Sequence, residues 1–179
     1  LSQEKWLEVK PGEIYELSGW LRTQGEGQVS LSVTLYDAKK EAIDWSFGGR
    51  NVRGDSDWRQ VQSRFVIPPD GAAILPRLTG RGTLTAWADD LGLRRAGRID
   101  LDKRAKLPAS ITKSNRAIEV ALHPADGTIT LRDLRCGQVW SQRPEKRYYV
   151  LDAKATPRGI EATLLEPATV SELAVALQL

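Results

Sequence analysis

Apolar side chains recur at every second position along two neighbouring segments, 15–22 and 29–36. Successive side chains on a β-strand point to opposite faces, so this alternation predicts two strands that each bury one face. Gly25 and Gly27 lie between the segments and predict the turn that joins them. The alternating residues are Tyr15, Leu17, Gly19 and Leu21 in the first segment and Val29, Leu31, Val33 and Leu35 in the second.

Shorter stretches of the same character predict strands along the rest of the chain. No stretch has the apolar spacing of a helix of three turns, although the Ala- and Leu-rich 170–177 fits a helix as well as a strand. The sequence therefore predicts an all-β protein. The further strands are expected over 6–9, 42–45, 59–67, 73–78, 84–93, 117–122, 127–134, 147–153, 159–165 and 170–179.

Tryptophan usage divides the chain into two parts. Five of the six tryptophans precede residue 95, and only Trp140 follows it. The change coincides with a charged, weakly periodic segment that ends at Pro108, as expected of a connector. We predict a first domain over 1–96, a linker over 97–108 and a second domain over 109–179. The chain ends within an apolar stretch, so we expect the second domain to be incomplete and the protein to be a piece of a longer polypeptide.

Composition argues against several broad classes. A hydrophobic fraction of 41% argues against disorder, and a single Cys rules out a disulfide framework. No apolar run approaches the roughly 20 residues of a membrane helix. The net charge is +3, but the basic residues of 94–106 are mixed with Asp100 and Asp102 instead of forming one basic face. We therefore expect neither a nucleic-acid partner nor a membrane partner.

Groups suited to catalysis are few. His123 is the only histidine, and Cys136 has no histidine near it in sequence. No zinc, nucleophile-elbow, phosphate-loop or dinucleotide motif occurs. Asp89 and Asp90 are adjacent, so on a strand they point to opposite faces and cannot flank one glycosidic bond. Asp89 at a strand end instead suits a calcium ion, which prefers oxygen ligands, or it is a solvated or locally hydrogen-bonded carboxylate.

The tryptophans of the first half need another explanation. An exposed indole offers a flat apolar face to a sugar ring, and nearby polar groups such as Arg77 can bond the hydroxyls. Trp20 and Tyr36 do not occupy the alternating apolar positions of their strands. Their side chains should therefore point to the opposite face of the strand, away from the core. Trp45 is expected at the edge of a loop at Gly48–Gly49. Each of these three rings is a candidate sugar contact, with packing or a lone exposed aromatic as the alternative, whereas Trp6 and Trp58 are expected to pack.

The order of short motifs resembles that of the jelly-roll carbohydrate-binding modules of secreted glycoside hydrolases. The resemblance covers most of residues 4–94. It implies a two-sheet sandwich of galactose-binding-like topology, with a sugar site on a concave sheet face or in the edge loops. The motifs are Val9-Lys10-Pro11-Gly12-Glu13-Ile14-Tyr15-Glu16-Leu17-Ser18-Gly19-Trp20-Leu21, Leu35-Tyr36-Asp37-Ala38, Asp57-Trp58-Arg59-Gln60-Val61, Phe65-Val66-Ile67-Pro68 and Gly82-Thr83-Leu84-Thr85-Ala86-Trp87-Ala88-Asp89-Asp90-Leu91.

The same resemblance implies a structural calcium ion. Asp89 matches the position that commonly helps to hold this ion in such modules, and Asp90 is the second candidate. Modules of this kind usually begin with a further strand that carries an Asn-x-x-Phe-Glu-like segment and supplies other calcium ligands. This chain starts after that segment, so the first strand of the jelly roll is expected to be missing.

The second half is similar to the N-terminal β-domains that precede the catalytic barrels of several glycosidases. The similarity rests on 115–122, 126–133 and 137–140. It implies a second antiparallel β-domain, of β-sandwich type. It also implies that the catalytic carboxylates of the parent enzyme lie beyond Leu179.

These observations predict a non-catalytic region that binds an oligo- or polysaccharide. The region would belong to an extracellular or periplasmic carbohydrate-active enzyme. It would tether the catalytic domain of the same polypeptide to the glycan substrate. The alternative is a structural or protein-interaction sandwich with no sugar site, because one sandwich architecture serves many roles. A self-contained hydrolase or lyase would need two carboxylates or a basic pair facing one groove.

Overall fold

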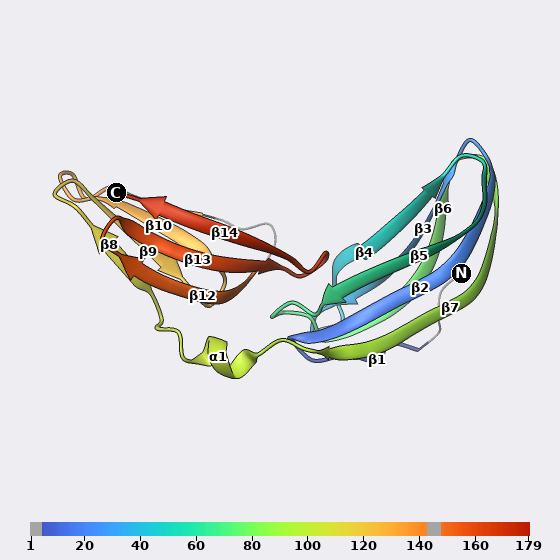
Figure 1. Cartoon of the computed structure of the whole chain (residues 1–179), viewed down its shortest axis with the longest axis horizontal. Helices are drawn as coiled ribbons and strands as arrows, with labels where there is room; N and C mark the ends of the chain where they lie inside the picture. The colour runs from blue at the N-terminus through green and yellow to red at the C-terminus, as the bar shows by residue number, and fades with distance from the viewer. Residues whose placement is uncertain (1–4, 143–147) are drawn as a thin grey trace. The chain divides into compact units, whose positions relative to one another are not determined.

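The structure, a computed structural model, describes residues 5–142 and 148–179. The chain divides into two compact units, Leu1–Ile99 and Asp100–Leu179. Almost all the regular structure is β-strand, and the one helix of the described residues, α1 (Leu101–Ala105), is five residues long (Figure 1). The predicted all-β class is confirmed.

The first unit consists of two antiparallel sheets. One has four strands in the order β1-β6-β3-β4, and the other has three in the order β5-β2-β7. The strand bounds are Leu7–Glu8 for β1, Glu13–Gly25 for β2, Gln28–Tyr36 for β3, Ala42–Arg53 for β4, Ser56–Val66 for β5, Ala73–Arg81 for β6 and Leu84–Arg98 for β7.

The core of this unit lies between the two sheets. The ring of Phe65 on β5 meets the ring of Phe47 on β4 edge to face, with 5.5 Å between the centroids. It also stacks on Tyr15 of β2 at 6.1 Å. The alternating residues of β2 and β3, among them Leu21 and Val33, are fully buried in this layer. The side of each strand that carries the alternating apolar residues is therefore the side that faces the opposite sheet.

Strand β4 runs through Gly48 and Gly49, where the sequence predicted a loop, so that prediction was wrong. Gly48 has a φ of +62°, and a Cβ atom there would lie 2.7 Å from the ring of Phe65. Glycine thus lets the strand continue while its backbone passes close over a core ring. The register between β3 and β4 shifts at this point, as in a β-bulge.

The second unit also has two antiparallel sheets, in the orders β11-β10-β9-β8 and β12-β13-β14. The segment 170–177, which fitted a helix or a strand, lies mostly in a strand. The sequence missed the short β8 and β11, and Arg147, the expected start of a strand, lies outside the described residues. The bounds are Ile111–Ser114 for β8, Ile118–His123 for β9, Thr128–Asp133 for β10, Val139–Ser141 for β11, Tyr149–Thr156 for β12, Gly159–Glu166 for β13 and Ser171–Gln178 for β14.

Side chains from both sheets form the core of the second unit, with Leu122 of β9 and Ile160 of β13 among the most buried. Helix α1, which falls within the segment 97–108, packs beside this core through Arg104. The guanidinium of Arg104 lies 5.1 Å from the centre of the Tyr149 ring. Its Nη2 donates hydrogen bonds to the carbonyls of Pro124 and Ala125 at 3.0 and 2.6 Å. The side chain of Arg104 therefore connects α1 to the turn at Pro124 and Ala125 and to β12.

Candidate functional site

The sheet β1-β6-β3-β4 carries polar side chains on the face that points away from the other sheet. Ser32 and Thr34 alternate along β3 with core residues such as Val33, so they lie on this outer face. Both are fully buried, which means that other side chains cover them. In Figure 1 the strands of the first unit bend, and β4 lies on the inside of the bend whereas β7 lies on the outside.

Two of the predicted site residues, Trp45 and Arg77, cover this row of hydroxyls. The guanidinium carbon of Arg77 lies 5.5 Å from the centre of the Trp45 ring. Nη1 of Arg77 donates to Oγ1 of Thr34 at 3.1 Å and to the carbonyl of Trp45 at 3.5 Å. The indole of Trp45 is nevertheless 62% exposed, so one of its surfaces is open to solvent. We call this surface, formed by Trp45 and Arg77 over the buried hydroxyls of Ser32 and Thr34, the Trp45 face.

The backbone of the neighbouring strands packs closely around the serines under the Trp45 face. Arg77 is the register partner of Ser32 across β6 and β3. On the β4 side, a Cβ atom on Gly49 would lie 2.9 Å from the carbonyl oxygen of Ser46 and 3.5 Å from both Oγ of Ser30 and Cβ of Ser32. Glycine at this position therefore lets the backbone of β4 pack closely against these serines. Oγ of Ser32 is buried and has no hydrogen-bond partner among the described residues.

Tyr36 lies on the same side of β3 as Thr34, but it is covered. Its ring stacks on Trp6 with 4.6 Å between centroids and an interplanar angle of 13°. Tyr36 is only 9% exposed as a result, whereas Trp6, which was expected to pack, keeps 38% of its surface open. Nζ of Lys40 lies 5.1 Å from the Trp6 ring. The aromatic surface at this end of the sheet is therefore Trp6, not Tyr36.

Trp20 belongs to the other sheet. It lies on β2, with Gln60 of β5 and Asp89 of β7 as register partners, and it is 40% exposed. On the same face, the guanidinium of Arg22 lies 5.0 Å from the Trp87 ring. Trp20 and Trp45 thus lie on opposite sheets and cannot contact the same sugar ring. Trp58, also expected to pack, is exposed.

Asp89 and Asp90 form a local backbone contact. Oδ1 of Asp89 accepts a hydrogen bond from the backbone N–H of Asp90 at 2.8 Å. Asp90 has a φ of +48° and lies where the register of β2 and β7 shifts, opposite Gly19. Within residues 5–142 and 148–179, no three His, Cys, Asp or Glu side chains are grouped so that they could hold a metal ion. The calcium site stays a prediction from the resemblance.

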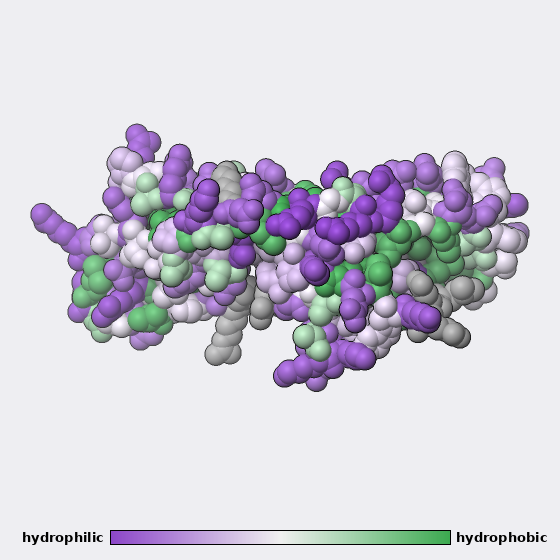
Figure 2. Space-filling model, turned by 90° about the horizontal axis from the view of Figure 1, so that it is seen from below, coloured by the Kyte–Doolittle hydropathy of each residue, from purple (hydrophilic) through white to green (hydrophobic). Residues whose placement is uncertain are grey.

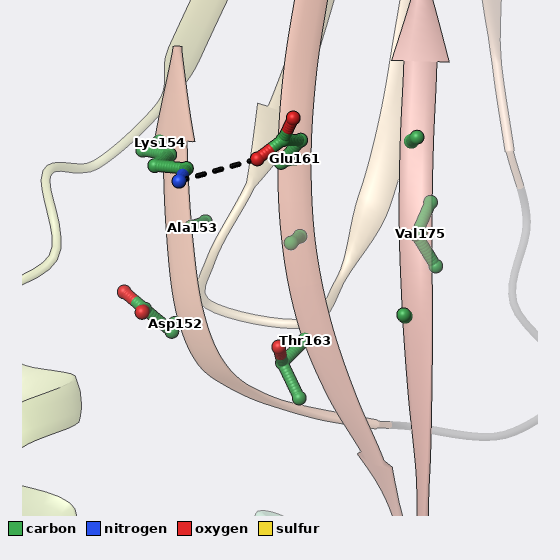
Figure 3. A pocket seen from close by; sticks show the side chains of 9 residues that line it. Asp152, Ala153, Lys154, Glu161, Thr163 and Val175 are labelled. Atoms are coloured by element: carbon green, nitrogen blue, oxygen red, sulfur yellow. Dashed lines mark ion pairs between the residues drawn. The ribbon is translucent and has the colours of Figure 1, made fainter. Parts of the chain in front are cut away.

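A shallow groove of about 360 Å³ lies on the sheet β12-β13-β14 of the second unit. Figure 3 shows Asp152, Lys154, Glu161 and Thr163 along it. Nζ of Lys154 lies 3.2 Å from Oε2 of Glu161, and both side chains are exposed. The groove therefore contains charged groups that already pair with each other, and its lining includes no aromatic ring.

Three further titratable groups lie in the second unit: His123 and Cys136, named from the sequence, and Asp133. Nε2 of His123 lies 3.0 Å from Oγ1 of Thr130, and Cys136 is an exposed free thiol. The guanidinium of Arg135 donates to both carboxylate oxygens of Asp133, which holds the pKa of that carboxyl well below its usual range. The first pair joins β9 to β10, and the second lies at the turn that follows β10.

A hollow of about 960 Å³ near the start of the first unit is lined by apolar, aromatic and charged residues, and two of the charged ones, Glu13 and Arg95, pair with each other. The buried Glu13 accepts a hydrogen bond from the hydroxyl of Tyr15 at 3.1 Å and lies 3.3 Å from Nη1 of Arg95. Burial, followed by the contact with Glu13, raises the pKa of Tyr15 above its ordinary value. The cluster connects β2 to the end of β7.

Exposed apolar residues alone do not single out a site. Large hydrophobic side chains are exposed on both units, including Leu91 and Trp140. Figure 2 shows hydrophobic areas interspersed with hydrophilic ones on the face in view. The Trp45 face differs because its indole is the most exposed of the six tryptophans, at 62%, and lies beside Arg77. Ser32 and Thr34 were not among the predicted site residues, although their alternation with Val33 places them on this face of β3.

The described residues include no helix that is both long enough and apolar enough to span a bilayer. No protein-family model and no curated protein matches the chain. Among solved structures, one similar chain is the CBM22-1 xylan-binding domain from Paenibacillus barcinonensis Xyn10C. That similarity has 16% identity and a TM-score of 0.42, and it covers 52% of this chain and 65% of that one.

A second similar structure is described as "CBM4 structure and function". It has 14% identity and a TM-score of 0.35, with 51% of this chain and 58% of that chain covered. The chain thus spans less than two thirds of each of these two structures. At such low values neither similarity indicates a function, so the function proposed below rests on the residues of the Trp45 face.

Proposed function

We propose that the first unit binds an oligo- or polysaccharide through the Trp45 face and has no catalytic role of its own. The supporting observation is the exposed indole of Trp45 beside Arg77, above the hydroxyls of Ser32 and Thr34. Sugar rings present apolar C–H groups on one face and hydroxyls at their rims. An open aromatic ring next to donors and acceptors matches both features.

Energetics favour a weak, reversible contact. Covering about 80 Å² of an apolar ring contributes about 2 kcal/mol at ~25 cal/mol per Å². Each hydrogen bond to a sugar hydroxyl adds about 0.5–1.5 kcal/mol net, and association itself has an opposing entropy cost. A face with one open indole and a few polar groups therefore binds in the range of roughly micromolar to millimolar Kd.

Weak binding is sufficient for a tethering role. A linked binding unit raises the effective concentration of an active site near its substrate without touching the bond that is broken. In this proposal the chain is part of an extracellular or periplasmic carbohydrate-active enzyme whose catalytic domain belongs to the same polypeptide.

Affinity electrophoresis of the whole chain in gels that contain soluble polysaccharides tests this function. The panel contains neutral polymers, such as xylan and mixed-linkage glucan, and polymers that carry uronic acids. We expect at least one polymer to retard the protein and isothermal titration to confirm a saturable interaction. If a folded sample migrates unchanged with every polymer, the carbohydrate-binding function is wrong.

A further inference from the structure

The Trp45 face extends along β3 into a polar surface that contains three arginines. Gln28 at the start of β3 is the register partner of Arg53 on β4 and of Arg81 on β6. Register partners lie on the same face of an antiparallel pair. Gln28 and Ser32 are four residues apart on β3, so their side chains point to the same face. Arg53 and Arg81, the partners of Gln28, therefore share this face with Arg77, the partner of Ser32.

Acidic side chains are absent from the corresponding register positions. From Gln28 to Thr34 none of the residues of this face on β3 is Asp or Glu, and none of their partners on β6 is acidic. On β4, the partners Asn51 and Arg53 are not acidic either. The positions read from the register are Gln28, Ser30, Ser32 and Thr34 on β3, Asn51 and Arg53 on β4, and Leu75, Arg77, Thr79 and Arg81 on β6.

None of the three arginines forms an ion pair with a residue that the structure describes. On the opposite sheet, by contrast, Glu16 pairs with both Arg64 and Arg94. Arg77 uses Nη1 on Thr34 and Trp45, and both of these acceptors are uncharged. Three unneutralised guanidinium groups on one face make it complementary to an anionic ligand.

We propose that the saccharide bound by the Trp45 face is anionic and that Arg53, Arg77 and Arg81 bind its acidic groups. This inference rests on the proposed function. A guanidinium is a planar fork that matches a carboxylate or a sulfate with two parallel hydrogen bonds. Arg77 and Arg81 are four residues apart on β6, about 13 Å along the strand at ~3.3 Å per residue. The face can therefore contact acidic groups on more than one unit of a polymer, while Trp45 stacks on a ring.

Matched pairs of polymers test the inference separately from the function. The probes are glucuronoxylan, polygalacturonate and alginate, each compared with the same polymer after its carboxylic acids have been reduced to alcohols. A dextran and its sulfate ester form the fourth pair. We expect at least one acidic member to bind about tenfold or more tightly than its neutral counterpart, and this difference to shrink as salt is raised. The pair that shows the difference tells whether carboxylate or sulfate is recognised.

Neutral members that bind as tightly as acidic ones would overturn the anionic assignment and leave carbohydrate binding intact. No binding to any polymer would instead refute the function itself. The two failures are therefore distinguishable in one set of titrations.

Arginine variants locate the contact. We expect Arg81→Gln and Arg53→Gln each to weaken binding of the acidic polymer about threefold to tenfold, because charge-assisted hydrogen bonds are roughly twice as strong as neutral ones. Binding of the neutral counterpart should change little. Arg59→Gln, on β5 of the opposite sheet, removes the same charge and is the control. An equal loss in Arg59→Gln would show unspecific attraction to a basic protein and would contradict a site on this face.

Discussion

Replacing Trp45 by alanine is expected to weaken saccharide binding by more than about tenfold while leaving the thermal unfolding midpoint nearly unchanged. The ring is 62% exposed, so the fold loses little packing when it is removed. The complex loses the apolar surface on which the sugar stacks, about 2 kcal/mol for ~80 Å² of ring covered. Arg77 also loses the ring beside it, at 5.5 Å, and with it part of its fixed orientation.

Two other tryptophan variants serve as controls for this experiment. Trp140 is similarly exposed but lies on β11 of the second unit, so Trp140→Ala should bind as well as the unmodified chain. Trp20→Ala removes an exposed ring from the opposite sheet and should also retain binding. Isothermal titration with the best polymer of the panel measures all three. A Trp45→Ala variant that binds normally would remove the basis of the proposed site.

The largest effect on stability is expected from Phe65→Ala. Phe65 is fully buried and contacts the rings of both Phe47 and Tyr15, so it connects the two sheets of the first unit. Truncating a buried phenylalanine removes its transfer free energy and leaves a cavity, at a cost of about 3–5 kcal/mol. Gly48 lies against the same ring, so the backbone of β4 can collapse only partly into the space.

Denaturant unfolding followed by tryptophan fluorescence measures this loss. Five of the six tryptophans belong to the first unit, so the signal reports chiefly on its unfolding. Phe65→Leu is the matched variant, because it keeps most of the apolar volume and should lose much less stability. A Phe65→Ala chain that unfolds within about 1 kcal/mol of the unmodified chain would contradict the packing described for this core.

Much of the first unit could be predicted from local pattern. Over 15–21 in β2 and 29–35 in β3, every second residue is apolar or glycine and faces the other sheet. The alternation therefore predicts both that the segment is a strand and which of its faces is buried. Gly48 and Gly49 misled the prediction because glycine in a short window indicates a turn. Their actual role, letting β4 pass close to Phe65, depends on a residue far away in the sequence. The short β8 and β11 were missed because three or four residues hold too little pattern.

The candidate site was harder to predict from the sequence, again because it depends on contacts between residues that are far apart in the chain. Parity places Trp20 and Tyr36 on the outer faces of their strands, but it does not show which sheet a strand joins or what covers a ring. Trp20 lies on the other sheet, and Trp6, thirty residues earlier in the chain, covers Tyr36. The contact between Trp45 and Arg77 likewise joins β4 to β6 across β3, and strand order alone decides it.

The central claim is that the open indole of Trp45 stacks on a saccharide. Nuclear magnetic resonance of the 15N-labelled chain tests it most directly, because each of the six tryptophans gives one indole N–H signal, assigned by single Trp→Phe replacements. Titration with a soluble oligosaccharide of the bound polymer should shift the Trp45 signal together with the backbone signals of Ser32 and Arg77, and leave the signal of Trp140 in place. A stationary Trp45 signal at saturating ligand would contradict the claim.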